Sequence, residues 1–174
     1  MRKVKGYIYI YLALLVILIG LIAFLLWRID YYNGLYAVHT SNINESGLCT
    51  LGTQEPTMLF FYGNDCKTCT ATETGFINAT ARFGTWTGGS FVATAPYFCA
   101  YLFNITQYNQ DPSGISAPLQ SIGIFNNYSQ GFVPLIVFGG KYYKIGGFAN
   151  ATLAYQEIFK YICLSINNVS SVCG

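Results

Sequence analysis

The sequence predicts one α/β domain with a mixed sheet flanked by helices, preceded by a transmembrane helix. Three features support this prediction: an uncharged apolar run near the N-terminus, short apolar segments typical of buried strands, and segments with helical periodicity. The 174 residues leave room for one ordinary domain after the membrane segment. Aromatic residues make up 17% of the chain and charged residues only 9%, a composition that excludes a disordered protein.

The N-terminal apolar run extends over Tyr7–Trp27 (YIYIYLALLVILIGLIAFLLW) and contains no charged residue. As a helix, a run of this length spans a hydrocarbon core of roughly 30 Å. The competing interpretation is a cleaved signal peptide, whose apolar core is usually about 7–15 residues long and ends in small residues. This run is longer and ends in tryptophan and arginine, so we expect a permanent membrane anchor.

The charges around the span predict its orientation. Arg2, Lys3 and Lys5 precede the span, so we expect the N-terminus in the cytoplasm and the rest outside. From Arg28 onward six basic residues stand against seven acidic ones, which gives nucleic-acid binding no electrostatic support. The expected organisation is a cytoplasmic tail over 1–6, the span over 7–27, a juxtamembrane connector over 28–54 and the domain over 55–174.

Two compositional features agree with an external domain. The chain has six cysteines, an even number that suits disulfides in an oxidising compartment. It also has six N-x-[ST] glycosylation triplets, where chance gives about two. An Asn- and Thr-rich surface makes such triplets by accident, but the excess favours a heavily glycosylated surface. The candidate asparagines are Asn44, Asn78, Asn104, Asn127, Asn150 and Asn168.

Apolar runs between turn residues predict the strands. Thr57–Tyr62 (TMLFFY) has the near-continuous apolar character of a strand covered on both faces. Gly139-Gly140 is a two-residue hairpin signal between two further apolar runs. The expected strands are Leu35–His39, Thr57–Tyr62, Pro96–Phe103, Leu135–Phe138 and Lys141–Ile145.

Two long helices and one short helix are expected beyond the membrane span. The first follows Gly63-Asn64-Asp65 and runs to about Phe83, with Cys69, Phe76, Thr80 and Phe83 on its buried face. The second runs from Ala151 to about Leu164 and is capped by Asn150. Between them, Gln107–Gly131 is expected to be mostly loop, with one short helix around Leu119–Phe125.

Cys66-Lys67-Thr68-Cys69 carries the clearest chemical signal. It stands where the first strand of the domain turns into the first helix, and free N–H groups at a helix N-terminus stabilise a thiolate. The second cysteine is then close enough to attack a mixed disulfide formed by the first. A structural disulfide remains an alternative. A zinc site is disfavoured because His39 is the only histidine and the other cysteines are scattered.

Val133-Pro134 is a second motif, since it opens the apolar strand LIVF that leads into the hairpin. With strand–CxxC–helix upstream and hairpin–helix downstream, residues 55–164 resemble the thioredoxin superfamily. The resemblance implies that Cys66 is the nucleophile and Cys69 the resolving thiol. It also implies that Pro134 is cis, packs on the cysteine pair and, with Val133, docks substrate.

The sequence also departs from the thioredoxin pattern. The tryptophan before the first cysteine is replaced by Asp65, and Gly-Pro between the cysteines by Lys67-Thr68. Phe60 stands where thioredoxins carry a buried carboxylate, and Gln107–Gly131 is longer than the corresponding segment. Arg82-Phe83-Gly84 further resembles a family of uncharacterised, membrane-anchored thioredoxin-like proteins from thermoacidophilic archaea.

The four remaining cysteines are expected to form structural disulfides. Cys163 and Cys173 flank a short tail after the last helix, which favours a bridge between them. Cys49 and Cys99 are then left to pair, although four cysteines allow three connectivities.

We expect an extracytoplasmic thiol–disulfide oxidoreductase that acts on exported cysteine-containing proteins, needs no cofactor or metal, and has a membrane redox partner. Oxidation or isomerisation is favoured, because no thiol pool outside the membrane keeps a dithiol reduced. One alternative is a tethered disulfide reductase fed by a membrane electron donor. Another is a glycosylated filament subunit, because Lys5-Gly6 before an apolar segment resembles the processing site of archaeal type IV pilins.

Overall fold

The computed structural model of the chain contains two compact units, Met1–Ala37 and Val38–Gly174. It describes residues 2–35, 37–49, 56–87, 89–93, 97–114 and 118–174. Within the first unit it describes the side chains of residues 11–29, 31 and 37.

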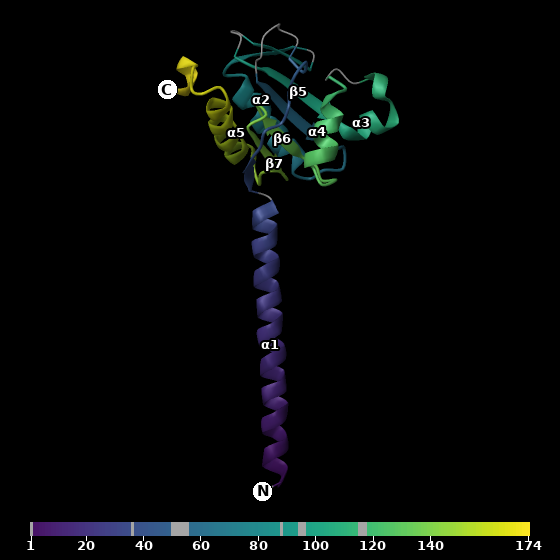
Figure 1. Cartoon of the computed structure of the whole chain (residues 1–174), viewed down its shortest axis with the longest axis vertical. Helices are drawn as coiled ribbons and strands as arrows, with labels where there is room; N and C mark the ends of the chain where they lie inside the picture. Colours follow the sequence, from purple (N-terminus) through teal and green to yellow (C-terminus); the bar gives the residue numbers. More distant parts are fainter. Residues whose placement is uncertain (1, 36, 50–55, 88, 94–96, 115–117) are drawn as a thin grey trace. The chain divides into compact units, whose positions relative to one another are not determined.

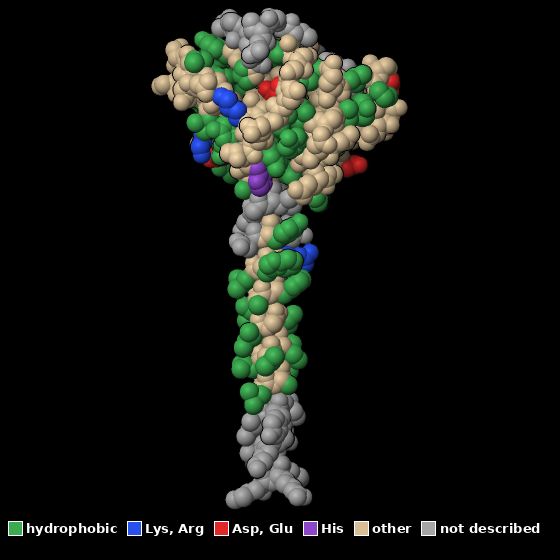
Figure 2. Space-filling model, viewed as in Figure 1, with side chains coloured by type: hydrophobic (Ala, Val, Ile, Leu, Met, Phe, Trp, Pro, Cys, Tyr) green, Lys and Arg blue, Asp and Glu red, His purple; other side chains and the backbone are tan. Residues whose placement is uncertain are grey.

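The first unit is built on one helix, α1 (Arg2–Leu35). Its segment Tyr11–Ile29 has a mean hydropathy of 2.7 and is long and apolar enough to cross a membrane. Figure 2 shows hydrophobic side chains along the described part of this helix. The helix continues beyond Trp27 to Leu35, so it includes the first residues of the expected connector. No glycine or proline occurs between Trp27 and Asn33-Gly34, and the helix ends one residue after this glycine.

The second unit is organised around a five-stranded mixed sheet with strand order β1-β7-β6-β2-β5. β2 pairs with β5 in parallel, and the other neighbouring strands pair in antiparallel fashion. The predicted mixed sheet is therefore confirmed, and Figure 1 shows helices on both of its sides. Its strands are β1 (Val38–Thr40), β2 (Thr57–Tyr62), β5 (Cys99–Asn104), β6 (Leu135–Phe138) and β7 (Tyr142–Ile145).

The central strand β2 is buried on both faces, as its apolar sequence predicts. Phe60 faces one helical layer and stacks on Phe76 of α2, with ring centroids 5.5 Å apart. Its neighbour Phe61 faces the other layer and lies 5.5 Å from the ring of Phe125 in α4. Because successive strand residues point to opposite faces, these two residues anchor the two hydrophobic layers of the domain.

The helices of the domain lie near the predicted places. In α2 the expected inward face is buried, whereas Asn78 is exposed. Asn150 caps α5 as predicted, because its Oδ1 accepts a hydrogen bond from the N–H of Leu153 at 2.9 Å. The helices are α2 (Cys69–Thr80), α3 (Ile105–Gln110), α4 (Ser121–Tyr128) and α5 (Ala151–Ser165), with short 3₁₀ turns η1 (Pro112–Gly114) and η2 (Ser171–Cys173).

Three elements differ from the sequence-based prediction. A two-stranded sheet, β3 (Gly84–Thr87) and β4 (Ser90–Ala93), follows α2 and was not expected. Helix α3 lies at the start of the segment expected to be loop. The first strand is β1, which begins three residues later than predicted because α1 occupies Leu35. Glu55 and Pro96, the expected first residues of the domain and of its second strand, lie outside the described residues.

The segment between β1 and residue 49 is fastened to the sheet by Glu45. Its Oε2 accepts a hydrogen bond from the N–H of Thr57 at 2.9 Å, at the start of β2. The backbone N–H of Gly140, in the β6–β7 turn, also hydrogen-bonds to this carboxyl group. Within the described part of the chain, Oε1 is buried and has no hydrogen-bond partner. Burial raises the pKa of Glu45 to about 7, against the lowering effect of the two backbone donors.

Candidate active site

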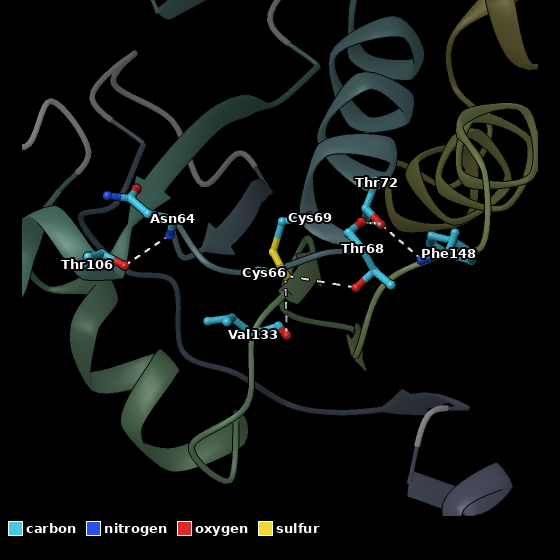
Figure 3. Close-up of a disulfide and its surroundings, with 8 residues drawn as sticks. All are labelled: Asn64, Cys66, Thr68, Cys69, Thr72, Thr106, Val133 and Phe148. Atoms are coloured by element: carbon cyan, nitrogen blue, oxygen red, sulfur yellow. Dashed lines mark hydrogen bonds between the residues drawn. A yellow bond between two sulfur atoms is a disulfide. The ribbon is translucent and has the colours of Figure 1, made fainter.

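The Cys66–Cys69 pair forms a disulfide in the turn between β2 and α2 (Figure 3). The N–H of Cys66 donates to the carbonyl of Gly63, and the N–H of Cys69 donates to the carbonyl of Cys66 at 3.1 Å. Cys69 is the first residue of α2. Cys66 therefore lies one turn ahead of the helix and not in its first turn, because tight turns occupy the residues between Gly63 and Thr68.

The two sulfur atoms differ in their surroundings. Cys69 is 3% exposed, whereas Cys66 is only half-buried. Sγ of Cys66 lies 3.7 Å from the carbonyl oxygen of Val133 and 3.9 Å from Oγ1 of Thr68. The Val133–Pro134 peptide bond is cis, and Pro134 is buried. The fold thus brings together the two motifs that stand 67 positions apart in the sequence.

Cys66 opens onto a pocket of about 420 Å³. One wall is the loop ahead of β6, where Phe132 is 46% exposed. Asp65 and Lys67, on either side of the cysteine, add one charge of each sign to the pocket. The site therefore offers an incoming segment an accessible sulfur, an exposed aromatic ring and backbone groups. The lining residues are Gly63, Asp65, Cys66, Lys67, Thr68, Thr106, Gly131, Phe132 and Val133.

The loop ahead of Cys66 is held by the end of β5 and the start of α3. Oγ1 of Thr106 accepts a hydrogen bond from the N–H of Asn64 at 3.1 Å (Figure 3). Nδ2 of Asn104 donates a hydrogen bond to Oδ1 of Asn64 at 2.9 Å. Two hydrogen bonds, one from the end of β5 and one from the start of α3, therefore fix the position of Asn64 in the loop ahead of Cys66.

The other side of the pair is held by the loop after β7. Oγ1 of Thr72 accepts a hydrogen bond from the N–H of Phe148 at 2.9 Å and donates to the carbonyl of Thr68 at 2.7 Å. Gly147 packs so closely on this turn that an added Cβ would lie 2.5 Å from Oγ1 of Thr68. A glycine is therefore required here for a close approach between the loop and the beginning of α2.

The core between β2 and α2 is aromatic. Phe60 is fully buried between Phe76 and Tyr62, so no carboxylate occupies this position of β2. The nearest acidic group on α2 beyond Cys69 is Glu73, one helical turn further on. Burial raises the pKa of the Glu73 carboxyl group. The pKa of the Tyr62 hydroxyl is also raised, mainly by burial and then by the charge of Glu73.

The other four cysteines form two bridges away from this pocket. Cys163, in α5, is bonded to Cys173 in the C-terminal turn. Cys49 is bonded to Cys99 at the start of β5. These are the pairs expected from the sequence, and all six cysteines, which lie within the described residues, are therefore in disulfides.

The described residues contain no group of three or more His, Cys, Asp or Glu side chains that could hold a metal ion. His39 lies in β1, where its ring stacks on Tyr143 with centroids 5.1 Å apart. The asparagines of five glycosylation triplets are exposed, and Asn104 is half-buried.

Sequence reasoning missed the residues that support the pair, namely Asn64, Thr72, Thr106 and Gly147. Thr106 was visible only as part of a glycosylation triplet, and Thr72 only as a polar residue within a predicted helix. Their roles depend on segments that meet through the sheet and not on local spacing. Comparisons of the chain with protein-family models, curated proteins and solved structures give no match.

Proposed function

We propose that this chain is a membrane-anchored thiol–disulfide oxidoreductase of the thioredoxin superfamily that acts on exported proteins. The observation that carries the proposal is the unequal Cys66–Cys69 disulfide. One sulfur is accessible in a pocket and lies beside the Val133 carbonyl, whereas the other is buried at the first residue of α2. This asymmetry is what two-step thiol–disulfide exchange requires, because one sulfur must meet the substrate and the other must resolve the intermediate.

The order of elements around the site supports the superfamily assignment. Strand β2, the cysteine pair and helix α2 come first, and strand β5 returns parallel to β2. The β6–β7 hairpin and helix α5 follow, with Val133-Pro134 directly ahead of β6. This is the order of strand–CxxC–helix and hairpin–helix on which the resemblance rests.

In the favoured direction the oxidised pair accepts two electrons from a substrate dithiol. A substrate thiolate attacks Sγ of Cys66, which breaks the Cys66–Cys69 bond and releases Cys69 as a thiolate that takes up a proton. A second substrate thiolate then attacks the substrate sulfur of the mixed disulfide and releases Cys66. The substrate gains one disulfide, and the pair is left as a dithiol. A redox partner in the membrane then returns the pair to the disulfide.

The N-terminal helix supports attachment to the membrane. Tyr11–Ile29 is long enough to span it, and the basic residues Arg2, Lys3 and Lys5 favour a cytoplasmic N-terminus. With a single span, the domain from Val38 onward is then outside the cell. The two bridges Cys49–Cys99 and Cys163–Cys173 suit that oxidising compartment.

Two features favour oxidation or isomerisation over reduction. Outside the membrane no general thiol pool maintains a dithiol, and the span Tyr7–Trp27 has no cysteine, histidine or charged residue to relay electrons. Phe60 also leaves this position of β2 without the carboxylate that assists proton transfer in reducing thioredoxins.

Trapping of mixed disulfides tests the proposed activity. In cells that express Cys69→Ser, the Cys66 thiolate attacks a substrate disulfide, and the product persists because the resolving thiol is missing. We expect exported cysteine-containing proteins in mixed disulfides with this variant and none with the Cys66→Ala control, which lacks the attacking thiol and creates no glycosylation triplet at Asn64. An absence of adducts with both variants would reduce the pair to a structural bridge.

Acid quenching of growing cells followed by alkylation tests the direction. We expect the Cys66–Cys69 pair to be mostly oxidised at rest. If the pair is mostly reduced, the assignment changes from an oxidase to the tethered reductase. The mixed disulfides expected from the trapping experiment would be the same.

A further inference from the structure

The six glycosylation triplets are not equivalent in the folded domain. A glycosyltransferase that recognises N-x-[ST] joins a sugar to the asparagine Nδ2 and reads the hydroxyl of the third residue. In a folded protein both residues must therefore be on the surface, where a bulky glycan is tolerated. This requirement divides the six triplets into three groups.

The triplet Asn44-Glu45-Ser46 meets the requirement, because Asn44 and Ser46 are both exposed. The N–H and hydroxyl of Ser46 both donate to Oδ1 of Asn44, at 3.0 and 2.7 Å. These bonds orient the amide through its oxygen and do not use Nδ2, the atom to which a sugar is joined.

The triplet Asn150-Ala151-Thr152 also meets the requirement that both the asparagine and the hydroxyl residue lie on the surface. Asn150 and Thr152 are exposed at the first turn of α5. Oδ1 of Asn150 caps the helix by accepting the N–H of Leu153 at 2.9 Å, which again uses the oxygen and not Nδ2. A glycan on this nitrogen is therefore compatible with the cap.

Three triplets expose the asparagine but bury the hydroxyl. Thr80 is fully buried, and its Oγ1 donates to the carbonyl of Phe76 at 2.8 Å. Ser129 and Ser170 are 1% and 3% exposed, and each Oγ accepts a backbone N–H two residues further on. An enzyme cannot read these hydroxyls without unfolding the chain. The corresponding asparagines are Asn78, Asn127 and Asn168.

The remaining triplet, Asn104-Ile105-Thr106, is engaged at the candidate active site. Nδ2 of Asn104 donates to Oδ1 of Asn64, and Oγ1 of Thr106 accepts the N–H of the same residue. Both groups that a transferase needs are therefore used to hold the loop ahead of Cys66, as Figure 3 shows for Thr106.

We propose that the folded domain carries N-linked glycans on Asn44 and Asn150 and on none of the other four asparagines. The donor is a lipid-linked oligosaccharide. The bond between the sugar C1 and the lipid phosphate oxygen breaks, C1 joins Nδ2, and Nδ2 loses one proton while the lipid phosphate leaves. The proposal rests on the external location argued above, but not on the chemistry of the cysteine pair.

Mass measurement of the full chain purified from the membranes of its native cells tests the proposal. We expect two glycan increments, and glycopeptides that carry Asn44 and Asn150. Ser46→Ala and Thr152→Ala should each remove one increment, because each destroys a triplet and leaves the asparagine in place. The matched Ser46→Thr and Thr152→Ser variants should retain both increments.

Asn127→Gln serves as a further control and should leave the mass increments unchanged. A chain without glycans, or a glycan on Asn78, Asn104, Asn127 or Asn168, would overturn the proposal. Cys66→Ala, which creates no new N-x-[ST] triplet at Asn64, should carry the same two increments as the unaltered chain, so the outcome is independent of whether the proposed redox activity is found.

Discussion

Glu45 should make the domain less stable at neutral pH than in acid. Its pKa is about 7 in the folded chain against an ordinary value of 4.5, because its carboxyl group is desolvated by burial. Below pH 4.5 the carboxyl group is protonated in both the folded and the unfolded state, so folding does not bury a charge. As the pH rises from 4.5 to 7, the unfolded state releases the proton and the folded state keeps it, so stability falls. The difference between the two pKa values corresponds to a loss of at most about 3 kcal/mol in the free energy of unfolding, and the full loss is reached above pH 7.

Glu45→Gln should remove this dependence, because the amide is uncharged and its oxygen still accepts the N–H of Thr57. Thermal unfolding of the full chain in a mild detergent, followed by circular dichroism at pH 4.5 and pH 8, measures the effect. At pH 8 we expect the variant to melt higher than the unaltered chain by up to roughly 10 °C, with little difference at pH 4.5. Glu157→Gln, on the surface of α5 near Lys160, is the matched control and should show no such divergence. A Glu45→Gln variant that is equally destabilised at both pH values would refute the reasoning.

Three further perturbations follow from the same contacts. Gly147→Ala should lower the free energy of unfolding, measured by chemical denaturation, by about 1–3 kcal/mol, because the added Cβ overpacks against the turn ahead of α2. Gly123→Ala is the control and should leave that free energy unchanged, because nothing lies within 4 Å of the added Cβ. Replacing both Cys163 and Cys173 by serine should lower stability by about 2–4 kcal/mol in the same assay, and an unchanged midpoint would contradict a stabilising role for the bridge. In the fully reduced chain, brief alkylation should label Cys66 before its buried partner, as read by peptide mass; equal labelling would contradict the difference in exposure.

The strands of the core could be predicted because their signals are local. Thr57–Tyr62 and Leu135–Phe138 are apolar runs with clear turn residues beside them, and both have the predicted bounds in the structure. The β3–β4 hairpin also has a local signal, two glycines at positions 88 and 89, but each of its strands is only four residues long and so shows little periodicity. Helix α3 is short and polar, so its only signal is the cap by Asn104, whose Oδ1 accepts the N–H of Gln107.

The contact between Cys66 and Cys69 could be predicted because their spacing alone places them within one turn. The neighbourhood of Val133 was expected only through a family resemblance. The supporting bonds of Asn64 and Thr72 could not be predicted at all. They join segments more than 40 residues apart, whose meeting depends on how the whole sheet is assembled.

The transfer of electrons between the pair and a substrate tests the central claim most directly. The oxidised full chain is mixed with a reduced peptide that carries two cysteines, and the thiols of both are counted over time by alkylation and mass. We predict one peptide disulfide for each chain converted, with Cys66 and Cys69 becoming reactive to alkylation while the other two bridges stay closed. A peptide that stays reduced, or thiols that appear first at Cys163 and Cys173, would contradict the assignment of this pair as the redox centre.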